Sequence, residues 1–407
     1  MSDALHFGTS MRDITPPAGS LMGAFPVSRD PMQARVAEGA HDPIMARAFA
    51  LRQKDMTVVV VVADVVSFQW PDVDVMRAAF AGRTGLPPES LIVCGTHNHN
   101  GPECTYLFGG RPDDPYIGHM RGRVVDAACE AIDALAPADL LVGSVDADLS
   151  YNRRRILPNG QFQQLSKNPD RLRNGPIDPK VTVLRLDRSD DRTALLHFAA
   201  HPVIMTAPNR LFTAEYPGET LRRFEAQTKI ADAIFLQGAC GDTHPYQAIT
   251  EDFAAVGEMG EGLAKAASSA WQQARAEHEL SLSVERWTGN LPHRYSSEHK
   301  VRIEATTVRL SPRLALVFWQ GEPFIELSLT LQWRSPLART IVVGYSLGWI
   351  GYVPTRQAYE YGGYGVSLHE GDPAEFSRTS VRPGTGEQIV DRTAELLLKL
   401  HDGAHTK

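Results

Sequence analysis

The sequence has few cysteines and no cysteine pair at a metal-binding or redox spacing. Only four occur in 407 residues, and none forms a CxxC pair; they are Cys94, Cys104, Cys129 and Cys240. So low a count in a long chain excludes a disulfide-built scaffold and predicts free thiols in a reducing compartment. A bridge between Cys94 and Cys104 is the alternative.

Long apolar runs are also missing. The longest, Val58–Val66, is interrupted by Asp64 and is far shorter than the roughly 20 residues that cross a bilayer. The first 20 residues contain no basic leader followed by an apolar stretch, so they do not read as a secretory signal. These absences predict a cytoplasmic protein with no membrane insertion.

No run of five basic residues occurs, and the net charge is −7. The densest basic stretch, "RRRIL" at 153–157, is too short to predict a nucleic-acid surface. Hydrophobic residues make up 43% of the chain, enough for a large core. We expect residues 1–407 to form one large domain whose partner is a small molecule; the oligomeric state is not readable.

Strand-like and helix-like stretches alternate through the first 240 residues. The β-branched run at 57–64 predicts a strand buried on both faces. Helices are expected at 71–85, 116–135, 252–280 and 386–400, and further strands at 90–96, 139–149, 180–187, 194–202, 233–242, 280–291, 301–311 and 314–323. This order predicts an α/β fold, with a mixed β-sheet core and flanking helices.

Polar residues gather in loops that follow predicted strands, at 95–104, 200–207, 238–245 and 320–323. In α/β folds such loops carry the chemistry. "GTHNHNGP" places His97 and His99 two residues apart after an apolar strand. Imidazole is the commonest metal ligand. The alternative is that one histidine caps the strand end while the other lies on the surface.

His201 and Glu322 strengthen the metal interpretation. His201 ends a strand and precedes Pro202, and Glu322 follows a Gly at the mouth of an apolar strand. A carboxylate there is costly to desolvate unless it is paired or bound to a metal. Two histidines and one carboxylate suit catalytic zinc with an open position, or Fe(II) in a facial triad. His201 alone could equally be a satisfied core histidine, the role we assign to His197.

Several motifs occur in the order of a known family: "DITPPAGSLMGAF", "GTHNHNGP", "NRRR", "HPV", "GACGD", "QGEP" and "GYVPTRQAYEYGGYGVS". Over roughly residues 8–370 the chain resembles the neutral (non-lysosomal) ceramidases, which are zinc-dependent amide hydrolases. The resemblance implies a ceramidase-like catalytic domain. It implies a zinc site formed by His97, His201, Glu322 and Tyr352.

The same resemblance implies that His99 lies beside the metal, where it could move protons or bind substrate. It implies that Arg153 could steady an anionic oxygen. The sequence departs from the family at His244, which stands where the ceramidases have a serine. A histidine there could act as general acid or base, or bind a polar substrate group; the alternative is a solvent-facing or supporting role. Glu215 is expected at a helix N-terminus, with no catalytic role assigned.

Two further departures bear on the substrate. The immunoglobulin-like C-terminal domain of the ceramidases is not found, and the segment between the Gly-Asp turn and Glu322 is shorter. We therefore expect a small soluble amide rather than a membrane lipid. Arginines 153–155 would suit a carboxylate or another anionic group on that substrate; the alternative is that they form a solvated loop.

The expected function is a zinc-dependent hydrolase that cleaves a C–N amide bond with metal-activated water. His99 or His244 would carry the proton to the leaving amine, and Arg153 or Tyr352 would hold the oxyanion. The alternatives are an esterase or lactonase that uses the same site, a non-haem iron oxygenase, and a metal-stabilised binding protein without turnover.

Overall fold

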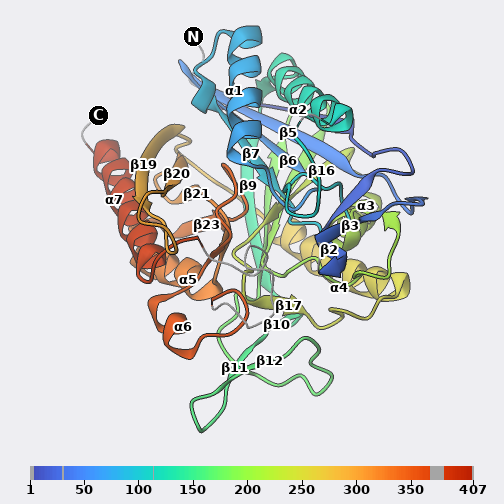
Figure 1. Ribbon diagram of the computed structural model, residues 1–407. Coiled ribbons are helices and arrows are strands. Elements are labelled where there is room, and N and C mark those ends of the chain that lie inside the picture. The colour runs from blue at the N-terminus through green and yellow to red at the C-terminus, as the bar shows by residue number, and fades with distance from the viewer. Residues whose placement is uncertain (1–3, 30–31, 113, 367–379, 406–407) are drawn as a thin grey trace.

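The computed structural model describes residues 4–29, 32–112, 114–366 and 380–405 (Figure 1). Ser367, the last residue of the final family-like motif, lies outside them. Within these residues the chain forms two five-stranded sheets, one four-stranded sheet and several two-stranded pairs. Each large sheet mixes parallel and antiparallel pairs. In the first sheet, β6 (Met56–Ala63) is parallel to β7 (Leu91–Gly95) and antiparallel to β5 (Met45–Gln53). The predicted α/β class, with mixed sheets and flanking helices, is confirmed.

The first sheet carries helices on one face. Because β6 contains five consecutive valines and successive side chains face opposite sides, it is buried on both faces, as predicted. Helices α1 (Trp70–Thr84) and α2 (Pro115–Asp133) pack on one of them, and Gly85, at φ 70°, ends α1. The strands in spatial order are β7 (Leu91–Gly95), β6 (Met56–Ala63), β5 (Met45–Gln53), β1 (His6–Asp13) and β8 (Ala136–Pro137).

The second sheet is covered by α3 (Glu215–Thr228) and α4 (Phe253–Gln273). Helix α4 ends before the predicted residue 280, because Arg275–Ala276 leave the helix and pair with β9 at the sheet edge. The strands in spatial order are β16 (Asp232–Gln237), β14 (Arg192–Phe198), β13 (Lys180–Asp187), β9 (Asp139–Asp146) and β18 (Arg275–Ala276).

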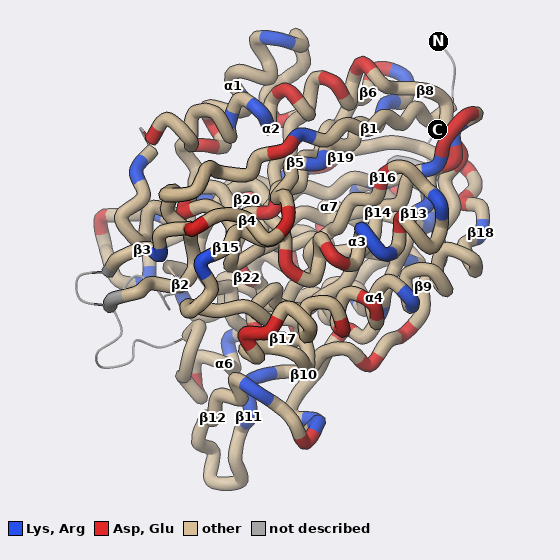
Figure 2. Tube along the Cα trace, turned by 90° about the vertical axis from the view of Figure 1, so that its right-hand side faces the viewer, with Lys and Arg blue, Asp and Glu red and all other residues tan. Residues whose placement is uncertain are grey.

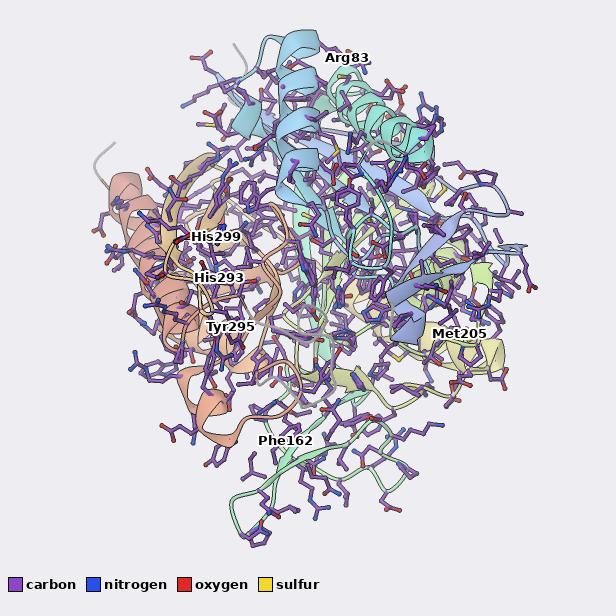
Figure 3. The ribbon with its side chains drawn as sticks, in the orientation of Figure 1. Arg83, Phe162, Met205, His293, Tyr295 and His299 are labelled. Carbon is purple, nitrogen blue, oxygen red and sulfur yellow. The ribbon has the colours of Figure 1, made fainter. Side chains whose placement is uncertain are left out.

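The third sheet lies in the C-terminal part, coloured orange to red in Figure 1, under α5 (Ile325–Arg334) and α7 (Thr385–His405). His293, Tyr295 and His299, labelled in Figure 3, mark the turn between its first two strands. The strands in spatial order are β19 (Ser283–Pro292), β20 (Lys300–Ser311), β21 (Leu314–Trp319) and β23 (Arg339–Val343).

The faces of the three sheets that carry no helices pack against one another. One apolar cluster combines Val60 of the first sheet, Leu195 of the second and Leu316 of the third, each at most 1% exposed. Because successive side chains of a strand point to opposite faces, about half of them pack against a pair of helices and the other half enter this shared core. The sheets meet tightly enough that His197, on β14, bonds through Nε2 to the Val342 carbonyl at 2.9 Å. His197 is therefore the satisfied core histidine that we predicted.

The segment Gly344–Leu347 ties the ends of all three sheets together. The Gly344 N–H donates to Gln237 at the end of β16, and the Gly95 N–H at the end of β7 donates to Tyr345. The Ser346 N–H donates to Trp319 at the end of β21. The loops that follow these strands are therefore brought to one place.

The remaining elements are short, and several surround the point where the loops after β7, β16 and β21 meet. A hairpin of β11 and β12 projects from the bottom of Figure 1. The short elements are β2 (Leu21–Arg29), β3 (Met32–Val36), β4 (Gly39–Ala40), η1 (Pro88–Ser90), β10 (Ser150–Asn152), β11 (Arg154–Ile156), β12 (Phe162–Gln164), β15 (Leu211–Phe212), β17 (Thr243–Pro245), β22 (Glu322–Pro323), β24 (Tyr352–Val353) and α6 (Arg356–Tyr361).

Two expectations about the whole chain can be compared with the structure. The four cysteines all lie in described residues and are free thiols, so the alternative Cys94–Cys104 bridge is wrong. No described helix has the length and apolar character that a membrane crossing requires. Basic and acidic residues are interspersed along the trace in Figure 2.

Candidate metal centre and pocket

His97 is held in a fixed orientation just beyond β7. Its φ of 62° is left-handed, which is costly for a residue with a side chain and is characteristic of functional sites. Its Nδ1 lies 3.1 Å from the Val66 carbonyl oxygen. The neighbouring Asn98 side chain donates to the carbonyls of Asp64 and Thr213, which fixes the loop. The free Nε2 atom of His97 therefore points away from its own strand.

His201 is oriented in the same manner from the second sheet. It lies three residues beyond the end of β14, and its backbone N–H donates to the Thr243 carbonyl at 3.0 Å. Its Nδ1 lies 2.9 Å from the Cys240 carbonyl oxygen. The two imidazoles meet with Nε2 atoms 2.8 Å apart, although 104 residues separate them in sequence.

These contacts fix where the imidazole protons lie. A carbonyl oxygen only accepts hydrogen bonds, so Nδ1 of each ring carries the proton and Nε2 carries a lone pair. Burial lowers the pKa of His97 to about 3 and the pKa of His201 well below its ordinary value, so both rings are neutral. Two lone pairs facing each other repel unless a cation lies between them. This carbonyl-oriented tautomer is typical of metal-ligating histidines.

Glu322 brings a carboxylate to the same point from the third sheet. Its Oε2 lies 3.1 Å from His97 Nε2 and 3.6 Å from His201 Nε2, and has no hydrogen-bond partner among the described residues. The preceding Gly321 has φ 62°, and a Cβ there would lie 2.3 Å from the Gly351 carbonyl. Only glycine therefore permits the turn that aims Glu322 inward.

His99 and Tyr352 complete the group. His99 Nε2 lies 3.0 Å from His97 Nε2, and the ligand atoms of His97, His99 and His201 all lie within 4.8 Å of one another. The Tyr352 hydroxyl hydrogen-bonds with Glu322. The structure thus gathers His97, His201 and Glu322 as the sequence suggested, with His99 as near to His97 as the other two are. Tyr352 reaches the group through Glu322.

Arg153 and His244 lie beside this group. Arg153 Nη2 donates to the Gly241 carbonyl and, at 3.4 Å, to the Tyr352 hydroxyl. His244, on β17, is buried, and its ring lies 5.6 Å from the ring of His201. His244 Nδ1 has no partner among the described residues, and the ring hydrogen-bonds with the backbone of Ser166. The position occupied by serine in the ceramidases is therefore at the site rather than on the surface.

A cavity of about 370 Å³ opens onto these side chains. It falls near the lower end of the roughly 300–1,000 Å³ usual for ligand pockets. A larger cavity, of about 880 Å³, lies between α3, α4 and the β4–β5 connection and includes none of the predicted site residues. The smaller cavity is lined by Phe25, Pro26, His99, Arg153, Gln164, Ser166, His201, Val203, Ala207, His244, Ile249, Tyr352 and Tyr364.

Sequence reasoning missed the residues that hold the site loops in place. Glu215, expected only as a helix-start carboxylate, accepts the backbone N–H groups of Ile204, Met205 and Tyr216. It thereby fixes the loop after His201, which Met205 marks in Figure 3. Its left-handed φ of 57° is the kind of signal that only coordinates reveal.

Arg35, on β3, was also missed. It is fully buried and donates to backbone carbonyls of three separate segments, at Gly23 on β2, at His99 and at Thr206. No pattern in the sequence around it indicates this, because its partners lie up to 174 residues away.

Comparisons with known proteins agree with the motifs. The sequence profile described as "Neutral/alkaline non-lysosomal ceramidase, N-terminal" matches residues 6–276. The neutral ceramidase of Mycobacterium tuberculosis (strain ATCC 25618 / H37Rv) is 25% identical over 238 residues, which cover 51% of this chain. The match spans only 36% of the length of that relative.

Two solved structures share the fold. The crystal structure of the neutral ceramidase from Pseudomonas aeruginosa superposes with a TM-score of 0.79 over 99% of this chain and 75% of its own, at 18% identity. A structure described as ceramidase complexed with C2 gives a TM-score of 0.77 over 98% and 76%, also at 18% identity. At this identity the likeness concerns the fold alone.

Proposed function

The chain belongs to the neutral/alkaline non-lysosomal ceramidase family, and from this premise we propose that it is a zinc-dependent hydrolase of a C–N amide bond in a small soluble substrate. One observation carries the proposal. Two buried imidazole lone pairs and a buried carboxylate oxygen, which has no hydrogen-bond partner in the described part of the chain, converge within 3.6 Å of one another. Such a set of acceptors is stable only around a cation.

The donor set fits zinc. Imidazole nitrogens with one carboxylate oxygen, and a position left open, form the usual catalytic zinc site, with the fourth protein ligand supplied by Tyr352 or His99. When bound, zinc would polarise the substrate carbonyl and make a neighbouring water acidic enough to attack near neutral pH.

The protein's own groups supply the remaining chemistry. Arg153 Nη2 lies 3.4 Å from the Tyr352 hydroxyl on one side of the site. Both groups can donate hydrogen bonds there and stabilise the negative charge that develops on the substrate's carbonyl oxygen. His99 and His244 each have a buried Nδ1 with no hydrogen-bond partner within the described ranges, so either can hold the proton that the leaving amine requires. We favour direct attack by water, because no serine stands at the position of His244.

The test is metal analysis with a substrate panel. We expect one zinc per chain by inductively coupled plasma mass spectrometry, and hydrolysis of N-acyl amines that stops on chelation and returns with zinc. The His97→Ala variant should lose both zinc and activity, whereas His197→Gln, which changes a histidine outside the site, should retain both. Iron in place of zinc would refute the zinc assignment.

The same panel separates amide hydrolysis from the nearest alternative. An esterase or lactonase would share every residue named above, but an alkoxide needs less help from a proton donor than an amine does when it leaves. Turnover of matched esters or lactones without turnover of amides would transfer the proposal to those bonds. Ligand binding with no product from any substrate would contradict enzymatic function altogether.

A further inference from the structure

Two buried guanidinium groups lie next to the candidate pocket with little negative charge to balance them. Arg35 is 0% exposed and Arg153 is 2% exposed. Charged groups of this kind are almost never buried without a partner of opposite charge. Their presence at one pocket therefore calls for an explanation.

Arg35 lies behind His99 and Phe25. Its guanidinium donates to five neutral oxygens, four backbone carbonyls and the side chain of Asn100, and no carboxylate is among its described partners. Burial lowers its pKa to about 9, which leaves it charged at neutral pH. It also lies over the ring of Phe25, 5.5 Å from the ring centre, and that ring lines the pocket.

Arg153 lines the pocket itself. It donates only through Nη2 among the described residues, to the Gly241 carbonyl and the Tyr352 hydroxyl, while its buried Nε has no partner. Two tyrosine rings pack against the guanidinium, with centres 5.7 and 4.8 Å from its central carbon. These rings exclude water from Arg153 but do not neutralise it.

The nearby carboxylates do not balance these charges. Glu322 supplies one negative charge and faces the imidazole cluster. Asp242 interacts electrostatically with both Arg153 and Arg154, and it lines a neighbouring cavity with Arg154. Around the candidate pocket, the guanidinium groups of Arg35, Arg153 and Arg154 thus face the two carboxylates of Glu322 and Asp242, and the divalent cation of the proposed function would add two more positive charges. A pocket with this field attracts anions and disfavours cations.

Three further polar atoms belong to side chains that line the pocket and have no hydrogen-bond partner in the described part of the chain. They are Nδ1 of His99, Oε1 of Gln164 and Nδ1 of His244, all buried. An unsatisfied buried polar atom costs roughly 1–3 kcal/mol. The His99 imidazole and the Gln164 amide can each present an N–H to an anionic group, whereas the neutral His244 ring uses its N–H on the Ser166 backbone.

We propose that the substrate amide carries a carboxylate within a few bonds of its scissile C–N bond, as an N-acyl amino acid does, and that Arg153 binds this carboxylate. The inference rests on the proposed hydrolase function and specifies the substrate of that same site. The short separation follows from the contacts: Arg153 touches Tyr352, and Tyr352 hydrogen-bonds with Glu322 of the metal cluster.

Matched substrates test the proposal. Hydrolysis of an N-acetyl amino acid is compared with that of its carboxamide, which has the same shape and no charge, across a panel of side chains. We expect kcat/KM to be at least tenfold higher for the acids, mainly through KM, and this advantage to shrink as salt is added. Equal rates, or faster hydrolysis of the carboxamides, would overturn the proposal.

Two variants test whether Arg153 causes the preference for acids over carboxamides. Arg153→Gln should reduce the ratio of acid to carboxamide activity to about one, while the loss of oxyanion stabilisation lowers both rates together. The control is Arg155→Gln, on the adjacent strand β11 and only half-buried, which should keep the ratio. A ratio unchanged by Arg153→Gln would refute the assignment to Arg153.

A binding measurement separates failure of this inference from failure of the proposed function. The melting temperature of the zinc-loaded protein is measured with N-acetylglycine and with N-acetylglycinamide. Stronger protection by the acid supports anion recognition even if no substrate is hydrolysed, in which case the proposed function alone fails. Hydrolysis of amides without preferential protection by the acid refutes this inference and leaves the hydrolase standing.

Discussion

Replacing the Glu322 carboxylate with a carboxamide should change the stability of the protein in opposite directions with and without a bound cation. Glu322 is 4% exposed, and burial raises the pKa of its carboxyl group to about 7 from an ordinary 4.5. The folded, metal-free protein therefore binds this proton more tightly than the unfolded chain does. Its stability falls as the pH rises from about 4.5 through about 7, and the full loss remains above that.

The magnitude follows from the two pKa values. Their separation corresponds to about 3 kcal/mol lost in metal-free protein well above pH 7. The Glu322→Gln variant has no such loss, and its amide can donate to the lone pair of His97. At about 2.1 cal/mol/K of unfolding entropy per residue, 3 kcal/mol raises the melting temperature of a 407-residue chain by about 3–4 °C.

When zinc is added, the wild type should melt above the Glu322→Gln variant. At a free concentration of about 1,000 times Kd, a cation that binds only the folded state adds about 4.1 kcal/mol, or about 5 °C here. The variant, with a neutral oxygen in place of the carboxylate, should gain little. Scanning calorimetry at about pH 8.5, with chelator and with zinc, measures both effects.

A second buried carboxyl group provides the control. Glu103 is 3% exposed and burial raises its pKa to about 7 as well, but it hydrogen-bonds with Thr105 and Leu107 rather than facing the imidazoles. Glu103→Gln should therefore leave the zinc-induced rise intact. The reasoning is refuted if metal-free Glu322→Gln melts below the wild type, or if it retains the full response to zinc.

Three other perturbations have defined outcomes. A Cβ at position 241 would lie 2.5 Å from the Glu322 backbone carbonyl, so Gly241→Ala should lower zinc occupancy by elemental analysis, whereas Gly118→Ala, with open space around its Cβ, should not. His244→Ala should lower kcat by about 10²–10⁴-fold with zinc content unchanged, as steady-state kinetics would show, if its imidazole transfers the proton; unchanged kcat would remove that role. Arg77 and Glu304 form a buried bidentate ion pair, so Glu304→Ala should cost about 3–5 kcal/mol in urea denaturation, and a loss under 1 kcal/mol would contradict the pair's importance.

The sequence predicted the individual elements better than their assembly. The valine run of β6 and the glycine that ends α1 are local signals, and both match the structure. Periodicity identifies two faces of a strand but does not say what covers each. The packing of three sheets through one shared core was therefore not predictable. Nor was the end of α4, which depends on pairing between Ala276 and β9.

In the candidate site, too, local signals could be predicted and features that depend on assembly could not. His97 and His201 follow apolar strands, so their chemistry could be anticipated from position alone. Tyr352 has no such signal and was identified only by resemblance. Arg35 was missed because its importance arises from contacts with loops that are distant in sequence, at His99 and Thr206.

The three side chains that converge come from three different sheets, since His97 follows β7, His201 follows β14 and Glu322 follows β21. A cation bound by all three side chains would therefore link the three sheets to one another. Tight binding could arise only after all three layers had docked, so metal capture would be a late event in refolding. Catalytic activity would then report completed assembly, and a chain with one layer misplaced would be inert rather than partly active.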